Sequence, residues 1–228
     1  MIPLYDDVPH GRTPIVMYSL VVANIIIFGY ELFLDAGGNL EPFIYDYALI
    51  PYNVVHLTDL HTFLTSMFMH GSYSHIIFNM LFLYIFGNNV EDNMGHTRFI
   101  TFYIITGICA SLLQIAFNPA SDIPNLGASG AISGVLAGYL VLHPKAKITT
   151  LIPLGYVMMM RKISALYFIG FWFVLQFFSG IASLGVSTGI AFWAHIGGFV
   201  SGLLLIYVFR KESRIKKMGE HYYFDDKF

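Results

Sequence analysis

Ser129 lies in a run of small residues that could expose a reactive hydroxyl. The run from Asn125 to Gly134 reads NLGASGAISG. A serine hydroxyl is a weak nucleophile until a neighbouring base takes its proton. Glycines also recur at 130, 134 and 138, and small residues at every fourth position are typical of closely packed membrane helices. The run alone therefore leaves two interpretations open, a nucleophile or a packing stripe.

Three further residues could supply the partners that a catalytic serine needs. His195 is the type of residue that most often serves as the base for a serine. His75 and Asn79 are spaced i, i+4, so on a helix they share one face and can direct donors at a common point. Each of the three, taken alone, could instead be a hydrogen-bonded tether between helices. Whether these residues are catalytic partners or tethers depends on where the helices that carry them place their side chains.

The composition is that of a membrane protein. Of 228 residues, 56% are hydrophobic and 11% are charged, and the mean hydropathy is +0.65. The length suits one domain or a compact bundle. A formal net charge of −2 gives no sign of nucleic-acid binding, and the single Cys109 excludes an intrachain disulfide. The first apolar run is too long for a cleaved signal peptide and lacks its small-residue cleavage site, so we expect it to stay as a membrane span.

Apolar segments that approach or reach bilayer length predict an all-α, polytopic bundle of six transmembrane helices. The expected spans are residues 14–34, 74–90, 98–117, 126–143, 163–179 and 190–209. Residues 35–73 mix charged and aromatic residues with short apolar runs, which predicts an interfacial, partly helical loop. Residues 148–160 are apolar but too short to cross, and Pro153 and Gly155 interrupt them, so we expect an interfacial or re-entrant segment.

The cationic residues support this count. With six spans, all 12 Lys and Arg residues fall on one side of the membrane. The positive-inside rule then predicts that both termini are cytoplasmic, most simply in an inner (plasma) membrane. The expected organisation is an exposed cytoplasmic tail at 1–13, a six-span domain at 14–209 and a basic cytoplasmic tail at 210–228, which we interpret as a juxtamembrane anchor.

This topology brings the polar residues to one depth. The spans that carry His75 and Asn79, Ser129, and His195 all enter from the outer face, and each residue lies within one or two turns of a helix start. Polar side chains at such depth usually face the bundle interior or a wet cavity. Since no Asp or Glu lies in the spans near this depth, a Ser129–His195 dyad is expected rather than a triad.

The chain resembles the rhomboid family of intramembrane serine proteases across essentially all six spans. The stretches that carry the resemblance are HGSYSHIIFN at 70–79, GASG at 127–130 and AHIGG at 194–198 followed by Gly202, with Glu91 and Gly95 after the second span.

The resemblance implies a role for each matching residue. Ser129 would be the nucleophile and His195 the general base and acid. His75 and Asn79, with the Ser129 amide, would bind the oxyanion, beside backbone shaped by Gly127. His70 would be structural, and Gly198 and Gly202 would bring the sixth helix against the fourth. The chain departs from the family at His61 and Thr62, where many members have Trp-Arg.

The implied activity is endoproteolysis of transmembrane segments, without a cofactor or metal. We expect other membrane proteins as substrates, the lipid bilayer as the environment, and no nucleic-acid partner. The small-residue loop at 180–189, or the fifth span, is a candidate gate. The rival interpretations are a transporter or channel that uses His70, His75 and His195 as a proton relay or metal site, and an inactive family member that binds membrane clients.

Overall fold

The computed structural model describes the whole chain except residues 10, 156, 185–189 and 212–228. Most of the predicted carboxyl-terminal tail and half of the candidate gate loop lie outside the described residues. Six helices of 14 to 22 residues form the bundle. They are α1 (Ile15–Ala36), α5 (Tyr73–Met94), α6 (His96–Phe117), α7 (Ser129–Leu142), α8 (Ala165–Ala182) and α9 (Phe192–Phe209).

Among the described residues, four helices are long and apolar enough to cross a bilayer, namely α1, α6, α8 and α9. The chain is therefore a polytopic integral membrane protein. The apolar helix α7 has only 14 residues, and α5 ends in the polar sequence VEDNM. The six-span count accordingly stays a prediction.

The core of the bundle lies where α5, α6, α7 and α9 meet. The helix α9 packs against both α6 and α7, and α7 also packs against α5. The largest fully buried side chains include Tyr103 of α6, Tyr139 of α7 and Phe86 of α5. The helix α8 is the least buried of the four candidate spans.

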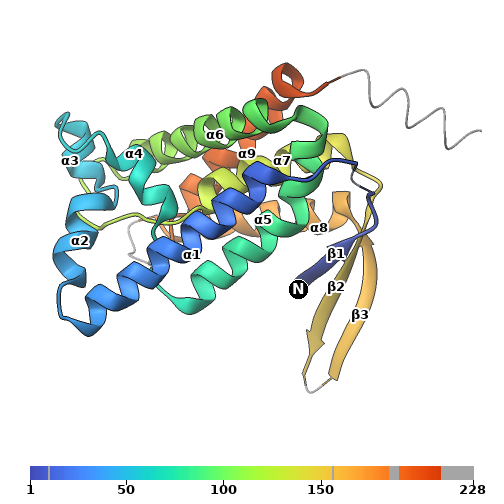
Figure 1. The fold of residues 1–228 in the computed structure, drawn as a ribbon, viewed down its shortest axis with the longest axis horizontal. Coiled ribbons are helices and arrows are strands. Elements are labelled where there is room, and N and C mark those ends of the chain that lie inside the picture. Colours follow the sequence, from blue (N-terminus) through green and yellow to red (C-terminus); the bar gives the residue numbers. More distant parts are fainter. Residues whose placement is uncertain (10, 156, 185–189, 212–228) are drawn as a thin grey trace, which may run out of the picture.

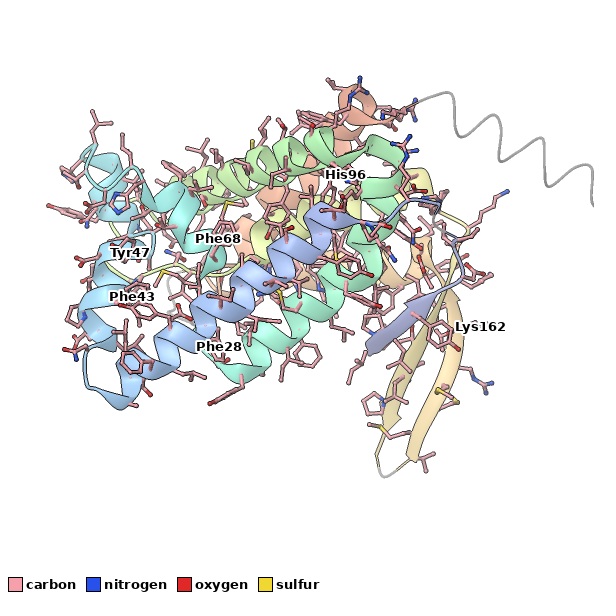
Figure 2. The ribbon with its side chains drawn as sticks, in the orientation of Figure 1. Phe28, Phe43, Tyr47, Phe68, His96 and Lys162 are labelled. Atoms are coloured by element: carbon pink, nitrogen blue, oxygen red, sulfur yellow. The ribbon has the colours of Figure 1, made fainter. Side chains whose placement is uncertain are left out.

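The expected loop at 35–73 is partly helical, as predicted. It contains α2 (Leu40–Tyr47), α3 (Pro51–Val55), α4 (Thr62–Thr65) and the 3-10 turn η1 (Ser66–Phe68). These elements gather at one end of the bundle (Figure 1). Phe43 and Tyr47 of α2 lie between α1 and α4 (Figure 2), where Phe43 packs edge-on against Tyr30 and Tyr47 against His61.

The all-α prediction is wrong in one region, because a three-stranded antiparallel sheet lies at the opposite end of the bundle (Figure 1). Its strands are β1 (Ile2–Asp6), β2 (Lys147–Leu154) and β3 (Val157–Ser164), in the order β1-β2-β3. Within the segment 148–160, residues 148–154 belong to β2 and residues 157–160 to β3. β-branched Ile148, Thr149 and Thr150 favour a strand, and this signal was missed when the segment was judged by hydropathy alone.

The amino-terminal segment also differs from the exposed tail that we expected. β1 pairs with β2, with Pro3 opposite Thr150, and Pro3 is buried. The Asp6 carboxylate accepts hydrogen bonds from the Tyr139 hydroxyl and the Asn89 amide, which belong to α7 and α5. These contacts fasten the segment to the bundle.

The Lys and Arg residues that the structure describes lie at the sheet end of the bundle, as the six-span arrangement requires. They are Arg12, Arg98, Lys145, Lys147, Arg161, Lys162, Arg210 and Lys211. Which side of a membrane this end faces stays a prediction.

Candidate active site

Ser129 and His195 form a direct hydrogen bond. The Ser129 Oγ lies 2.8 Å from Nε2 of His195. Ser129 is the first residue of α7, and His195 lies in the first turn of α9. The two residues are 66 positions apart in the chain, so the packing of two helices creates the pair.

Close contact between α7 and α9 positions this pair. A Cβ atom at Gly198 would lie 1.9 Å from the carbonyl oxygen of Gly130, and one at Gly202 would lie 2.5 Å from that of Gly134. No residue larger than glycine fits at these positions of α9 without a shift of backbone. In the stripe itself, a Cβ atom at Gly130 would lie 2.6 Å from Ala110 and one at Gly134 would lie 2.5 Å from Thr106, both on α6. The packing interpretation of the stripe is thus confirmed. It coexists with the reactive interpretation, because Gly198 and Gly202 of α9 let Ser129 approach His195.

The residues before Ser129 are held by the loop at 35–73. Leu49 and Asn125 exchange two backbone hydrogen bonds of 2.8 and 2.9 Å, and the Gly127 N–H donates to the carbonyl of Ser66 at 2.8 Å. Gly127 has φ +130°, a conformation that residues with a side chain rarely adopt. These contacts hold residues 125–127 in a non-helical segment before the helix. The helix α7 therefore starts at Ser129 and not at the predicted residue 126.

His75 lies beside Gly127 and the serine. A Cβ atom at Gly127 would lie 2.7 Å from both Cε1 and Nε2 of the His75 ring, and 3.7 Å from Ser129 Oγ. The hydroxyl of Ser72 accepts a hydrogen bond from the His75 N–H and so caps α5. The absence of a side chain at Gly127 therefore leaves room for His75 next to the serine.

Asn79 follows His75 by one helical turn on α5. Its side chain is buried, and its Nδ2 has no hydrogen-bond partner among the described residues. A buried donor without a partner normally costs free energy, so its presence calls for a functional explanation. Asn79, His75, Ser129 and His195 all line one cavity of about 770 Å³.

His70 supports His75 from the loop before α5. The two rings meet edge-on with centroids 5.0 Å apart, and the backbone N–H of His70 donates to the carboxylate of Glu31. Burial lowers the pKa of His70 to about 4, with a further contribution from the neighbouring His75, so its ring is neutral at neutral pH. Neither ring nitrogen of His70 has a partner in the part of the chain that the structure describes.

Two glutamines near the dyad were missed by the sequence analysis. The Gln176 Oε1 of α8 lies 2.7 Å from Nδ1 of His195, and the Gln114 Oε1 of α6 accepts from the Ala194 N–H at 3.2 Å. A lone amide inside a long apolar segment is the signal that could have found both.

The histidines do not assemble a metal site in the described residues, where no group of three or more His, Cys, Asp or Glu side chains could hold a metal ion. The cavity is lined by the hydrogen-bonded Ser129 hydroxyl and His195 imidazole, with the side chains of His75 and Asn79 nearby. This arrangement is chemically suited to acyl transfer.

Comparison with known proteins identifies the family of the chain. The family model described as "Rhomboid domain" matches residues 57–212, which is more than half of the chain. The chain belongs to the rhomboid family. The matched region includes α4 to α9 and therefore every residue of the candidate site.

Individual rhomboid relatives are distant. The chain is 27% identical to RHOMBOID-like protein 1 of Arabidopsis thaliana, over 86% of this chain and 53% of that protein. It is 31% identical to Rhomboid protein 1, mitochondrial, of Saccharomyces cerevisiae, over 58% of this chain and 38% of that protein. It is 27% identical to Rhomboid protease AarA of Providencia stuartii, over 82% and 69%. The chain thus spans about half or less of the first two relatives.

Proposed function

We propose that this rhomboid is a serine endopeptidase that cleaves transmembrane segments of other membrane proteins. Ser129 is the nucleophile and His195 the general base and acid. The observation that carries the proposal is the 2.8 Å hydrogen bond between Ser129 Oγ and His195 Nε2. The similarity to a rhomboid protease supports the reaction class.

The reaction begins when Ser129 Oγ attacks the carbonyl carbon of the scissile peptide bond and its proton moves to Nε2 of His195. The imidazolium then gives this proton to the leaving amine as the C–N bond breaks. Water attacks the resulting acyl-serine and passes a proton to His195, which returns it to Ser129 as the ester bond breaks. One peptide bond and one water are consumed in each cycle.

The oxyanion of both tetrahedral intermediates needs fixed donors. Three groups at the cavity fit this role, namely the side chains of His75 and Asn79 and the Ser129 N–H. The last is at a helix start, where backbone amides lack intrahelical acceptors. The unpartnered Nδ2 of Asn79 supports its assignment as a donor, because the oxyanion would supply the missing acceptor.

The proposed location follows from the same arrangement. We assign the protease domain to residues 14–209 and both termini to the cytoplasm of a cell with this protein in its plasma membrane. The cations at the sheet end support this orientation. The cavity would then open toward the outer leaflet, where a substrate helix could enter and unwind.

Entry would require α8 or the loop after it to move. The helix α8 is the least buried candidate span, and Ser183 of the described part of this loop lines the cavity. Residues 185–189 of the predicted gate lie outside the described residues. Paired cysteines that join this loop to the loop at 35–73 should suppress cleavage, and unchanged cleavage would exclude a gate there.

The decisive experiment uses the purified full chain in detergent with a single-span membrane protein as substrate. Wild type should cut the substrate, and its serine should react with a fluorophosphonate probe. Ser129→Ala should abolish both signals, and His195→Ala should abolish labelling. Ser201→Ala is the matched control, because the Ser201 hydroxyl on α9 donates to the Gly198 carbonyl and does not line the cavity.

Two results would overturn the proposal. Cleavage that persists in Ser129→Ala would assign the chemistry to another residue or to a contaminant. A folded wild type that neither cuts nor reacts would indicate a protein that binds membrane clients without cleaving them, and ion flux in proteoliposomes would instead indicate a transporter.

A further inference from the structure

We propose that Gln176 of α8 is a positioning residue that keeps the proton of His195 on Nδ1, so that Nε2 is free to accept the proton of Ser129. This inference rests on the proposed function. It is carried by the fact that His195 uses both ring nitrogens: Nε2 lies 2.8 Å from Ser129 Oγ, and Nδ1 lies 2.7 Å from Gln176 Oε1.

The contact between His195 Nδ1 and Gln176 Oε1 affects which ring nitrogen carries the proton. A neutral imidazole carries its proton on one nitrogen and accepts with the other. His195 can act as a base toward Ser129 only when Nε2 is bare and Nδ1 carries the proton. An amide oxygen accepts hydrogen bonds and donates none, so Gln176 Oε1 stabilises this tautomer and not the other.

The position of Gln176 is that of the third member of a triad. In Ser-His-Asp enzymes a carboxylate at Nδ1 holds the imidazole in its productive tautomer and orientation. No Asp or Glu side chain that the structure describes lies on α8 or α9. The neutral amide supplies orientation without placing a charge in the bilayer, where charged side chains are costly.

A purely structural role for Gln176, as a tether between α8 and α9, explains fewer of the observed contacts. Gln176 is the only amide or charged side chain on α8, and a polar side chain in a membrane helix usually has a specific partner. The helices already contact through Phe173, which stacks on Phe199 with centroids 4.3 Å apart. The ring of His195 also lies near Trp172 and Phe192, so the amide is not required to fill space.

The test compares Gln176→Leu, which removes the acceptor, with Gln176→Glu, which retains an acceptor oxygen in either protonation state. The matched control is Phe173→Leu, which weakens α8–α9 packing and leaves the acceptor intact. In nitrogen-15 spectra of histidine-labelled full chain in detergent, the signals lost in His195→Ala belong to His195. Wild type and Phe173→Leu should show a protonated Nδ1 and a bare Nε2.

Gln176→Leu should shift proton occupancy from Nδ1 toward Nε2. Its kcat should fall about tenfold, the equivalent of one neutral hydrogen bond, with KM within about twofold of wild type. Gln176→Glu should restore the Nδ1 proton and most of kcat. If Gln176→Leu does not fold, Gln176→Met is judged by the same criteria.

An unchanged tautomer in the folded Leu or Met variant would overturn the inference, as would an equal loss of kcat in Phe173→Leu. The spectra do not depend on turnover. A wild type that fails to cleave would therefore overturn the proposed function, while the nitrogen signals would still decide the role of Gln176.

Discussion

Gly198 of α9 contacts the backbone of Gly130 of α7 so closely that a Cβ atom at position 198 would lie 1.9 Å from the Gly130 carbonyl oxygen. Gly130 directly follows Ser129, and Gly198 lies three residues after His195. The separation of the two helices at this point therefore determines whether the hydroxyl and the imidazole are within hydrogen-bond distance.

Gly198→Ala should separate α7 from α9 and disrupt the dyad. The added methyl group meets backbone, which cannot rotate away, so we expect a loss of about 1–3 kcal/mol in the free energy of unfolding, as for other overpacked cores. Fluorophosphonate labelling of Ser129 should fall in parallel. Thermal unfolding in detergent and the labelling rate measure the two effects.

Gly29→Ala is the control for Gly198→Ala. Gly29 is also in the interior of a helix, but a Cβ atom there would meet nothing within 4 Å. This variant should keep wild-type labelling and gain up to about 1 kcal/mol from helix propensity. Equal behaviour of the two variants would show that the close contact does not control the site.

Asn79→Leu should lower activity without lowering stability. If the Asn79 amide donates to the oxyanion, its removal should lower kcat about 10²–10³-fold. Because its Nδ2 has no partner among the described residues, a leucine, which has the same branched shape, should leave the unfolding temperature unchanged or higher. Steady-state cleavage and thermal unfolding should be measured on the same preparation.

Asn24→Leu is the matched control for a buried amide. Asn24 is fully buried on α1, and its amide donates to the Leu20 carbonyl at 2.7 Å, outside the cavity. It should retain kcat. If Asn79→Leu lowered kcat by less than about tenfold, or clearly lowered the unfolding temperature, Asn79 would be a structural residue.

The pairing of Ser129 with His195 could be predicted from the sequence because two independent signals agreed. Apolar segments near bilayer length and the one-sided distribution of cations together placed both residues near helix starts on the same side. The resemblance to the rhomboid family then implied that Gly198 and Gly202 bring the two helices together. The lengths of the apolar segments and the positions of the cations can be read directly from the sequence, without knowledge of the tertiary contacts.

The strands and the supporting contacts could not be predicted in the same way. β1 pairs with β2 across more than 140 residues of chain, and its register depends on the bundle that holds Asp6 against Tyr139. The backbone pairing of Leu49 with Asn125 involves no side-chain chemistry that a motif could reveal. Gln176 is a single polar residue whose partner is known only once α8 lies against α9.

Asp6 should make stability depend on pH. Burial raises the pKa of its carboxyl above the ordinary 3.8, assisted by the neighbouring Asp7 and opposed by the hydrogen bonds from Tyr139 and Asn89. The folded state thus binds the proton more tightly than the unfolded state. Its contribution to stability is full below the ordinary pKa and is lost as pH rises through the raised value.

Asp6→Asn removes this titration and keeps an oxygen that can accept from Tyr139. The unfolding temperature of the variant relative to wild type should therefore rise as pH increases from the ordinary pKa of Asp6 through its raised value. Other titrating groups are common to both proteins and cancel in the difference. A difference that is constant with pH, or that falls, would contradict the assignment.

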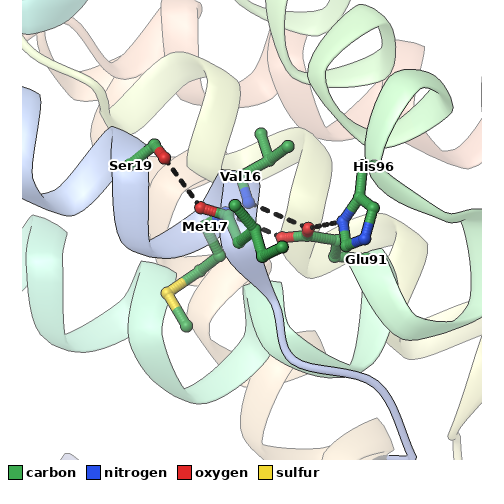
Figure 3. Close-up of polar contacts among 6 residues, drawn as sticks. Val16, Met17, Ser19, Glu91 and His96 are labelled. Carbon is green, nitrogen blue, oxygen red and sulfur yellow. Dashed lines mark hydrogen bonds and ion pairs between the residues drawn. The ribbon is translucent and has the colours of Figure 1, made fainter.

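Glu91 should stabilise the bundle without taking part in catalysis. Its buried carboxylate accepts from the Val16 and Met17 N–H groups at the start of α1, at 2.9 and 2.7 Å, and from Nδ1 of His96 (Figure 3). Carboxylates favour helix starts, where backbone donors are free. It lies 16 residues after His75 on α5, which corresponds to about 24 Å along a helix.

In Glu91→Gln the amide NH₂ cannot accept from a backbone N–H, so at least one of these three donors loses its partner. The free energy of unfolding should fall by about 1–3 kcal/mol, seen as a lower unfolding temperature in detergent. Below that temperature, kcat per folded molecule should equal that of wild type because the dyad is distant. Glu41→Gln is the control, because Glu41 is exposed in the first turn of α2 and its side chain accepts no cap hydrogen bond there from the described residues. It should retain kcat and change the free energy of unfolding by less than about 1 kcal/mol. If Glu91→Gln lowered kcat in a fully folded sample, the carboxylate would have to act on the site through α5, and its assignment as a structural cap would be wrong.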